Sequence, residues 1–311
     1  MEFKHISVLL DESIEGLNVK PDGVYADGTL GGGGHSSLIC SKLSENGRLI
    51  GIDRDCDALA AAKERLSEYN CQIDYCHNNF FNIKSILEEK GIDGLDGAII
   101  DLGVSSHQLD TAERGFSYNA DARLDMRMDK SAPFDAYTLV NTYDEKRLAD
   151  VIFKYGEERY ARRIAKAICE KREVSPIETT FELTDIIRQA FPAGERFGDK
   201  HPAKRTFQAL RIEVNGELEG LEDAIRNFVD ALKPGGRLAI ISFHSLEDRI
   251  VKNTFAELTK GCTCPKDFPV CVCGGKPIVK LVNRKPVLAG DEELSNNFRA
   301  HSAKLRIIEK L

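Results

Sequence analysis

The sequence predicts an α/β fold in which an all-helical domain is inserted into a parallel, doubly wound sheet. From residue 23 to residue 101, short apolar runs alternate with amphipathic helical segments, as in strands joined by helical crossovers. The alternation resumes at 218–243 with an amphipathic helix, a Pro-Gly stop and an apolar run. More residues separate Asp101 from this helix than one crossover needs, so we expect the inserted domain between them.

Length and composition indicate a folded protein of the cytoplasm. The 311 residues are 42% apolar, enough for a sizeable core, and a net charge of −7 argues against electrostatic affinity of the whole molecule for nucleic acid. The chain shows no secretory signal and no apolar run as long as a membrane span, so we expect no membrane partner. Nine cysteines, an odd number, fit reduced thiols.

The first half of the predicted sheet domain consists of four strands and the helices that connect them. Residues 7–12 precede it and are expected to begin a small surface helix at the sheet edge. We expect strands at 23–27, 48–52, 72–76 and 97–101, and helices at 36–44, 55–68 and 80–90. Since ligands bind at the carboxyl ends of parallel strands, the residues after each strand are candidate site residues.

A glycine-rich turn, residues 28–34, follows the first strand, which ends at Asp27. Glycines let the backbone take positive φ and approach a ligand closely, and the next helix offers unpaired N–H donors. The second strand ends at Asp53, where a carboxylate is placed to bind a ribose diol. The alternative is a tight turn without a ligand.

The spacing of the glycines argues against a dinucleotide. That fingerprint needs Gly or Ala three residues after its second glycine, and here Ser36 or Ser37 stands there. Asp27 would repel a pyrophosphate but suits a ligand with an amino group and a positive centre. S-adenosylmethionine has adenosine, an ammonium group and a sulfonium, and it fits.

Other strand ends offer further candidates. Phe80 would cover the adenine or pack in the core. Asp101 ends the fourth strand, where an acceptor atom should meet a methyl group, and Ser105 and Gln108 lie in the small polar segment behind it. His244 follows the strand expected at 237–243 and would position substrate; a Ser-His nucleophile pair is not indicated because no elbow motif surrounds it.

The inserted domain is expected to be helical and locally basic. We place it at 110–212, with the sheet domain at 1–109 and 213–311. Helices are expected at 143–153, 157–172, 181–190 (capped by Thr179 or Thr180) and 201–214. Residues 145–215 hold 15 Lys and Arg against 12 Asp and Glu.

Two groups of side chains in this domain suit RNA. The helix at 157–172 gathers Arg159, Arg162, Arg163 and Lys166 on one face, and the segment 204–211 combines Arg205, Phe207 and Arg211, which offer phosphate binding and base stacking. The alternative is a solvated surface balanced by neighbouring glutamates.

The C-terminal part completes the sheet. The helix at 218–232 is expected to break at 233–236, and two strands at 278–288 and 303–309 to pair antiparallel, joined by a polar loop at 291–301. Four thiolates would bind a structural zinc ion: Cys262, Cys264, Cys271 and Cys273. Within each pair, however, only one residue stands between the two cysteines, whereas two or more are usual in zinc sites. A reduced loop cluster is the alternative.

Taken together, several motifs resemble the bacterial RsmH (MraW) family, which methylates N4 of a cytosine in 16S ribosomal RNA at the decoding centre of the small subunit. The matching stretches lie at 27–35, 51–55, 101–110, 113–117, 124–129, 155–159, 205–211 and 241–249. The resemblance implies the Rossmann-like sheet of class I S-adenosylmethionine-dependent methyltransferases with a helical insert. It also implies cofactor contacts at Gly33, Gly34, His35, Asp53, Phe80, Asp101 and Gln108, to which the residue-based argument adds Asp27.

The resemblance makes 16S rRNA, within the small ribosomal subunit, the expected partner, and a homodimer one option for the assembly. Asp101, Ser105 and His244 are the candidate catalytic residues, and which group accepts the N4 proton stays open. No metal is required for this step. Two rivals remain: a methyltransferase for small molecules or proteins, and a non-catalytic RNA-binding protein.

Overall fold

The computed structural model describes residues 7–197, 201–261, 264, 270 and 275–311. The chain divides into two compact units. The sheet unit comprises Met1–Gly103 and Glu219–Leu311, and the helical unit comprises Val104–Leu218. From the sequence, the two boundaries between these units were expected after residue 109 and after residue 212.

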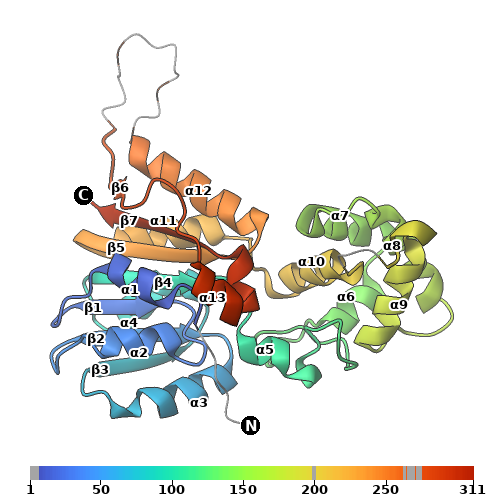
Figure 1. Ribbon diagram of the computed structural model, residues 1–311, viewed down its shortest axis with the longest axis horizontal. Helices are drawn as coiled ribbons and strands as arrows, with labels where there is room; N and C mark the ends of the chain where they lie inside the picture. Colours follow the sequence, from blue (N-terminus) through green and yellow to red (C-terminus); the bar gives the residue numbers. More distant parts are fainter. Residues whose placement is uncertain (1–6, 198–200, 262–263, 265–269, 271–274) are drawn as a thin grey trace. The chain divides into compact units, whose positions relative to one another are not determined.

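A seven-stranded sheet in the order β3-β2-β1-β4-β5-β7-β6 forms the centre of the sheet unit (Figure 1). β1 to β5 are parallel, and β7 is antiparallel to both of its neighbours. This order, with its reversed strand, is that of the class I methyltransferase sheet, so the predicted fold class is confirmed. The strands are β1 (Val24–Asp27), β2 (Arg48–Asp53), β3 (Gln72–His77), β4 (Leu95–Asp101), β5 (Leu232–Ser242), β6 (Val279–Leu281) and β7 (Lys304–Lys310).

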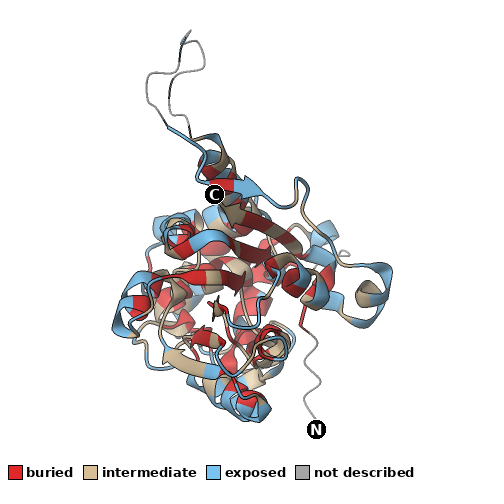
Figure 2. Ribbon diagram, turned by 90° about the vertical axis from the view of Figure 1, so that its left-hand side faces the viewer, coloured by how far each residue is buried: buried red, intermediate tan, exposed pale blue. Residues whose placement is uncertain are grey.

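Helices cover both faces of this sheet, and most residues of its central strands β1, β4 and β5 are buried (Figure 2). On one face, α1, α2 and α3 share an apolar core with the strands. On the other, α11 contacts α4 and α12. The helices of this unit are α1 (Leu10–Leu17), α2 (Gly34–Cys40), α3 (Cys56–Arg65), α4 (Ile83–Glu89), α11 (Leu221–Ala231), α12 (Ser245–Lys260) and α13 (Asp291–Asn296).

The helical unit has its own apolar core, which includes Leu148, Ile164, Leu183 and Leu210, all fully buried. The capping box between Thr179 and Glu182 starts α9, as the sequence indicated for that position. The helices are α5 (Ser106–Asp110), α6 (Ala136–Thr142), α7 (Glu145–Gly156), α8 (Ala161–Arg172), α9 (Thr180–Ala190) and α10 (Ala203–Asn215).

Several expected boundaries were wrong. The helix expected from 157 begins at Ala161, because Glu157 takes a left-handed φ of 49° and ends α7 instead. The segment at 233–236 does not precede β5 but lies within it, as an irregularity between two paired stretches. The strand expected at 278–288 is only β6, and the polar loop expected at 291–301 contains α13 and a 3-10 turn.

None of the helices within the described ranges is both long enough and apolar enough to cross a bilayer.

Candidate active site

The glycine turn is tied to the ends of two strands. Gly31 and Gly33 have φ of 50° and 76°, values that favour glycine. The N–H of Gly31 donates to Asp53 Oδ2 at 2.7 Å, and the N–H of Leu30 donates to Ile52 O at 2.9 Å. The turn after β1 is therefore held against the end of β2.

The Asp27 carboxylate accepts hydrogen bonds from residues of this turn and of α2. It is 2% exposed, its Oδ1 accepts from the N–H of Thr29 at 3.1 Å, and its Oδ2 accepts from Ser36 Oγ at 2.7 Å. Burial raises the pKa of this carboxyl to about 6, and the hydrogen bonds only partly oppose the shift. The residue expected to touch a ligand thus fixes the turn and α2.

Gly34 and His35 pack against the start of the chain. A Cβ on Gly34 would lie 1.8 Å from Ser7 Oγ, and the buried His35 ring bonds through Nε2 to Val8 O at 3.0 Å. By contrast, a Cβ on Gly32 would meet no atom within 4 Å. Of the glycines in this turn, Gly32 is therefore the one with open space beside it. The cofactor-binding residues predicted from the sequence did not include Gly32.

Phe80 lies beside the start of the turn. A Cβ on Gly28 would be 3.1 Å from Phe80 Cβ. The half-buried Phe80 ring packs edge-to-face on Phe81 at a centroid distance of 4.7 Å and lies 6.4 Å from the Phe228 ring. Phe80 therefore packs among aromatic side chains next to the turn, as one of the two alternatives expected, and its contact with an adenine stays a prediction.

Asp101 carries a buried oxygen without a partner. Its backbone N–H donates to Thr29 Oγ1 at 2.6 Å, which joins the end of β4 to the turn. Its Oδ1 is buried and makes no hydrogen bond among the described residues. Burial, reinforced by the charges of Asp27 and Glu247, raises the pKa of Asp101 well above its usual range. The Asp101 carboxyl therefore favours its protonated form more than an exposed aspartate does.

Asp27, Asp53 and Asp101 end three neighbouring strands, β1, β2 and β4. Burial also raises the pKa of Asp53, while the N–H groups of Asp55 and Gly31 oppose the shift. The sequence therefore identified three acids that the fold brings to one sheet edge. Their shared position is what a ligand with several polar groups requires.

His244 and Glu247 form the next part of this edge. His244 is the N-cap of α12, and its Nδ1 accepts from the N–H of Glu247 at 3.4 Å. The Glu247 carboxylate, 1% exposed, accepts from the N–H groups of Phe243 at 2.8 Å and His244 at 3.2 Å. Sequence reasoning missed Glu247, although the Ser-Leu-Glu that follows His244 has capping-box spacing.

Ser105 and Gln108, two further candidates, belong to the helical unit. They form a capping box at α5, in which the N–H of Ser105 donates to Gln108 Oε1 at 3.0 Å and the N–H of Gln108 donates to Ser105 Oγ at 3.2 Å. Gln108 is 4% exposed. Their described hydrogen bonds order the start of this short helix.

The candidate RNA-binding residues divide into two groups. Arg162, Arg163 and Lys166 are exposed on α8, and Arg205 is exposed on α10. Arg159, also exposed, pairs with Glu195 and lies over the Tyr160 ring.

Phe207 is a correction to the predicted RNA-binding set, whereas RNA binding by Arg211 stays a prediction. Phe207 is 3% exposed because α10 turns it into the helical core, so its ring is not available to stack on a base. Arg211 makes a two-pronged ion pair with Glu217 at 2.8 Å and contributes to the end of α10.

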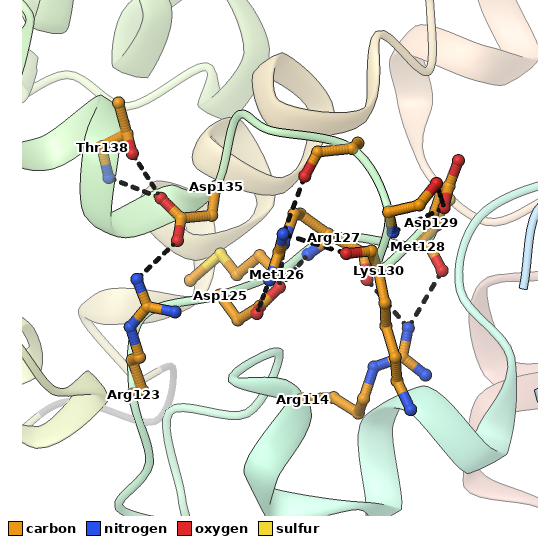
Figure 3. Close-up of polar contacts among 12 residues, drawn as sticks. Arg114, Arg123, Asp125, Met126, Arg127, Met128, Asp129, Lys130, Asp135 and Thr138 are labelled. Carbon is orange, nitrogen blue, oxygen red and sulfur yellow. Dashed lines mark hydrogen bonds and ion pairs between the residues drawn. The ribbon is translucent and has the colours of Figure 1, made fainter.

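Side-chain hydrogen bonds and ion pairs hold a polar loop in the helical unit (Figure 3). Met126, fully buried, has a φ of 58°, which is strained for a residue with a side chain. Buried Arg114 donates to the carbonyls of Arg127 and Met128 at 2.8 and 3.0 Å, and Asn215 Nδ2 donates to Met126 O at 2.7 Å. These contacts explain why the motif at 124–129 has a defined structure.

Three of the four cysteines predicted to bind zinc lie outside the described residues. They are Cys262, Cys271 and Cys273, whereas Cys264 lies within the described residues. In the part of the chain that is described, no cluster of three or more His, Cys, Asp or Glu is arranged to hold a metal ion.

Comparison with known proteins gives matches along the whole chain. Residues 2–311 match the family described as the MraW methylase family. Three curated relatives share the name ribosomal RNA small subunit methyltransferase H. The one from Clostridium botulinum (strain Loch Maree) is 59% identical over 312 residues, covering 100% of both chains. Those from Lachnospira eligens and Brevibacillus brevis are 56% and 53% identical over 311 residues, covering 100% of this chain and 99% of theirs.

Proposed function

The chain belongs to the MraW methylase family, and from this premise we propose that it transfers a methyl group from S-adenosylmethionine to N4 of a cytosine in 16S rRNA, at the decoding centre of the small subunit. The observation that carries the proposal is the buried, unpartnered Oδ1 of Asp101, at a strand end bonded to the glycine turn. The names of the curated relatives support ribosomal RNA of the small subunit as the substrate.

The sheet edge fits S-adenosylmethionine. Gly31 and Gly33 give the turn its positive-φ course, and the space beside Gly32 is open. Asp53 would bind the ribose hydroxyls, since a carboxylate that accepts two backbone N–H groups retains further lone pairs. Phe80 would lie against the adenine. When bound, S-adenosylmethionine supplies an electrophilic methyl group attached to a positively charged sulfur.

Asp101 would act on the acceptor. The amino nitrogen of cytosine is a poor nucleophile because its lone pair is delocalised into the ring, so orientation matters, and alignment of two reactants is worth up to about 7–11 kcal/mol in good models. Asp101 Oδ1 would accept a hydrogen bond from that amino group. The nitrogen must lose a proton as it gains the methyl group. Because its pKa is raised, ionised Asp101 would hold that proton more firmly than an exposed aspartate.

The two units would have different roles in the reaction. In this proposal the sheet unit is a discontinuous methyltransferase domain, and the helical unit recognises the substrate. The target base must leave its stack to be methylated. The exposed cations of α8 and α10, Arg162, Arg163, Lys166 and Arg205, would contact phosphates and hold the RNA in register. The cytoplasm, where ribosomes are assembled, is the proposed location.

A transfer assay distinguishes this proposal from its rivals. The purified chain is incubated with tritiated S-adenosylmethionine and, separately, with small ribosomal subunits, naked 16S rRNA, protein or small-molecule acceptors. We expect label in the RNA. Label only in protein or a small molecule would make it a methyltransferase of another class. Cofactor and RNA binding without transfer to any acceptor would favour the non-catalytic alternative.

A further inference from the structure

Two buried polar atoms that make no hydrogen bond lie at the carboxyl edge of the sheet. Among the described residues, Asp101 Oδ1 and His244 Nε2 are buried and make no hydrogen bond. β4 and β5 are neighbours, with Asp101 opposite Ile241 and the N–H of Leu102 donating to Ile241 O at 3.0 Å. His244 follows the end of β5. Buried polar groups normally make hydrogen bonds, so two that make none at adjacent strand ends point to a ligand that supplies both.

The two atoms have opposite hydrogen-bonding characters. His244 Nδ1 accepts from the N–H of Glu247, which leaves Nε2 as the ring nitrogen that carries a proton and donates. This Nε2 lies 3.1 Å from Glu247 Oε1 but outside hydrogen-bonding geometry. Asp101 offers an acceptor oxygen, because a carboxyl retains one in either protonation state. The edge therefore presents one acceptor and one donor.

Glu247 keeps the donor in place. Its carboxylate bonds to the N–H groups of Phe243 and His244, and its own N–H occupies Nδ1 of the imidazole. Both interactions fix the His244 side chain and its tautomer. Since Nδ1 is occupied and Nε2 already carries a proton, His244 is not arranged as a general base. This refines the role predicted for it from the sequence.

We propose that His244 is a specificity-determining residue that donates from Nε2 to the ring nitrogen N3 of the target base, while Asp101 accepts from the neighbouring amino group. Cytosine presents a donor at N4 and an acceptor at N3, which complement this pair. Uracil presents the reverse, an acceptor at O4 and a donor at N3, and would leave both protein atoms unsatisfied. Flipped bases are commonly read in this way, through their Watson–Crick edge. The inference rests on the proposed function and adds to it the means of base selection.

The test removes one protein atom, His244 Nε2, and one base atom, N3 of the target cytosine, separately and together. Small subunits are reconstituted with 16S rRNA that carries either cytidine or 3-deazacytidine, which has a C–H in place of N3, at the target position. Wild type is compared with His244→Asn, because Asn retains an N-cap oxygen for α12. His244→Gln, whose longer amide can bring an N–H donor to the position of Nε2, is a second variant and should keep more of the discrimination than His244→Asn; calorimetry with S-adenosylmethionine shows that each variant is folded.

We expect 3-deazacytidine to lower kcat/KM about 10- to 100-fold on wild type, the cost of leaving a buried donor unpaired. On His244→Asn the two RNAs should differ less than about threefold, because the shorter Asn amide, although its N–H₂ group is a donor, does not reach the position of Nε2. Independent, multiplying losses from the two changes would overturn the role of His244 and leave the proposed function intact. No transfer by wild type to the cytidine RNA would overturn the proposed function itself, and this inference with it.

Discussion

The carboxylate of Asp53 accepts a hydrogen bond of 2.7 Å from the backbone N–H of Gly31. This bond joins the end of β2 to the middle of the glycine turn that follows β1. The other carboxylate oxygen of Asp53, Oδ1, accepts from the N–H of Asp55 at 2.8 Å, so the side chain is oriented before any ligand arrives. The proposed cofactor site is thus preorganised, which reduces the entropy lost on binding.

Asp53→Ala should weaken binding of S-adenosylmethionine by at least about tenfold, since it removes a hydrogen-bonding carboxylate and loosens the turn. Isothermal titration calorimetry measures this directly. Asp230→Ala, which removes a carboxylate from an exposed ion pair with Lys84, is the control and should bind like wild type. Equal affinities for all three proteins would exclude Asp53 from the cofactor site.

Gly32→Ala should separate binding from folding. The added methyl group meets no protein atom, so the free energy of unfolding should change by less than about 0.5 kcal/mol. If the cofactor lies in the open space there, its affinity should fall about tenfold or more. Gly290→Ala, also in open space, should change neither quantity. Unchanged cofactor affinity in Gly32→Ala would contradict the proposed position of the ligand.

Asp27 should make stability depend on pH. Burial raises its pKa to about 6, so the folded protein retains a proton that the unfolded chain releases at lower pH. The stability that this proton contributes is complete below the ordinary pKa of aspartate and is lost as the pH rises towards 6. Between pH 4 and pH 6.5, wild type should therefore lose on the order of 2–3 kcal/mol relative to Asp27→Asn. Urea denaturation at both pH values measures the difference, and parallel pH profiles would refute the account of Asp27.

Exposed cations on α8 should govern the salt dependence of RNA binding. Removing Arg162 and Lys166 together, both to alanine, should reduce the slope of log affinity against log salt by about 1.4, the value for two phosphate contacts to single-stranded RNA. Filter binding across a salt series provides the measurement. The doubly substituted control, Lys42→Ala with Lys63→Ala, alters exposed cations of the sheet unit. A slope that changes equally in both variants would assign the effect to net charge.

The sequence predicted the sheet well because its signals are local. Apolar runs ending in Asp27, Asp53 and Asp101 specify strands and strand ends without knowledge of the rest of the fold. The left-handed Glu157, which separates α7 from α8, could not be predicted, because a residue with a side chain rarely takes that conformation.

The interior positions were harder to predict. The basic segment around Phe207 resembled a nucleic-acid surface, but the apolar stripe of α10 determined which side chains are buried. The two buried atoms of Asp101 and His244 that make no hydrogen bond depend on contacts across neighbouring strands and on the capping box at α12. No spacing along the chain reveals them.

The central claim, that Asp101 directs methyl transfer to N4 of a cytosine in 16S rRNA, is tested most directly in cells. Nucleoside mass spectrometry is applied to 16S rRNA from cells with the gene, without it, and with Asp101→Ala in its place. We expect N4-methylation of one cytidine in the first case only. Normal methylation with Asp101→Ala, or no difference when the gene is absent, would contradict the account.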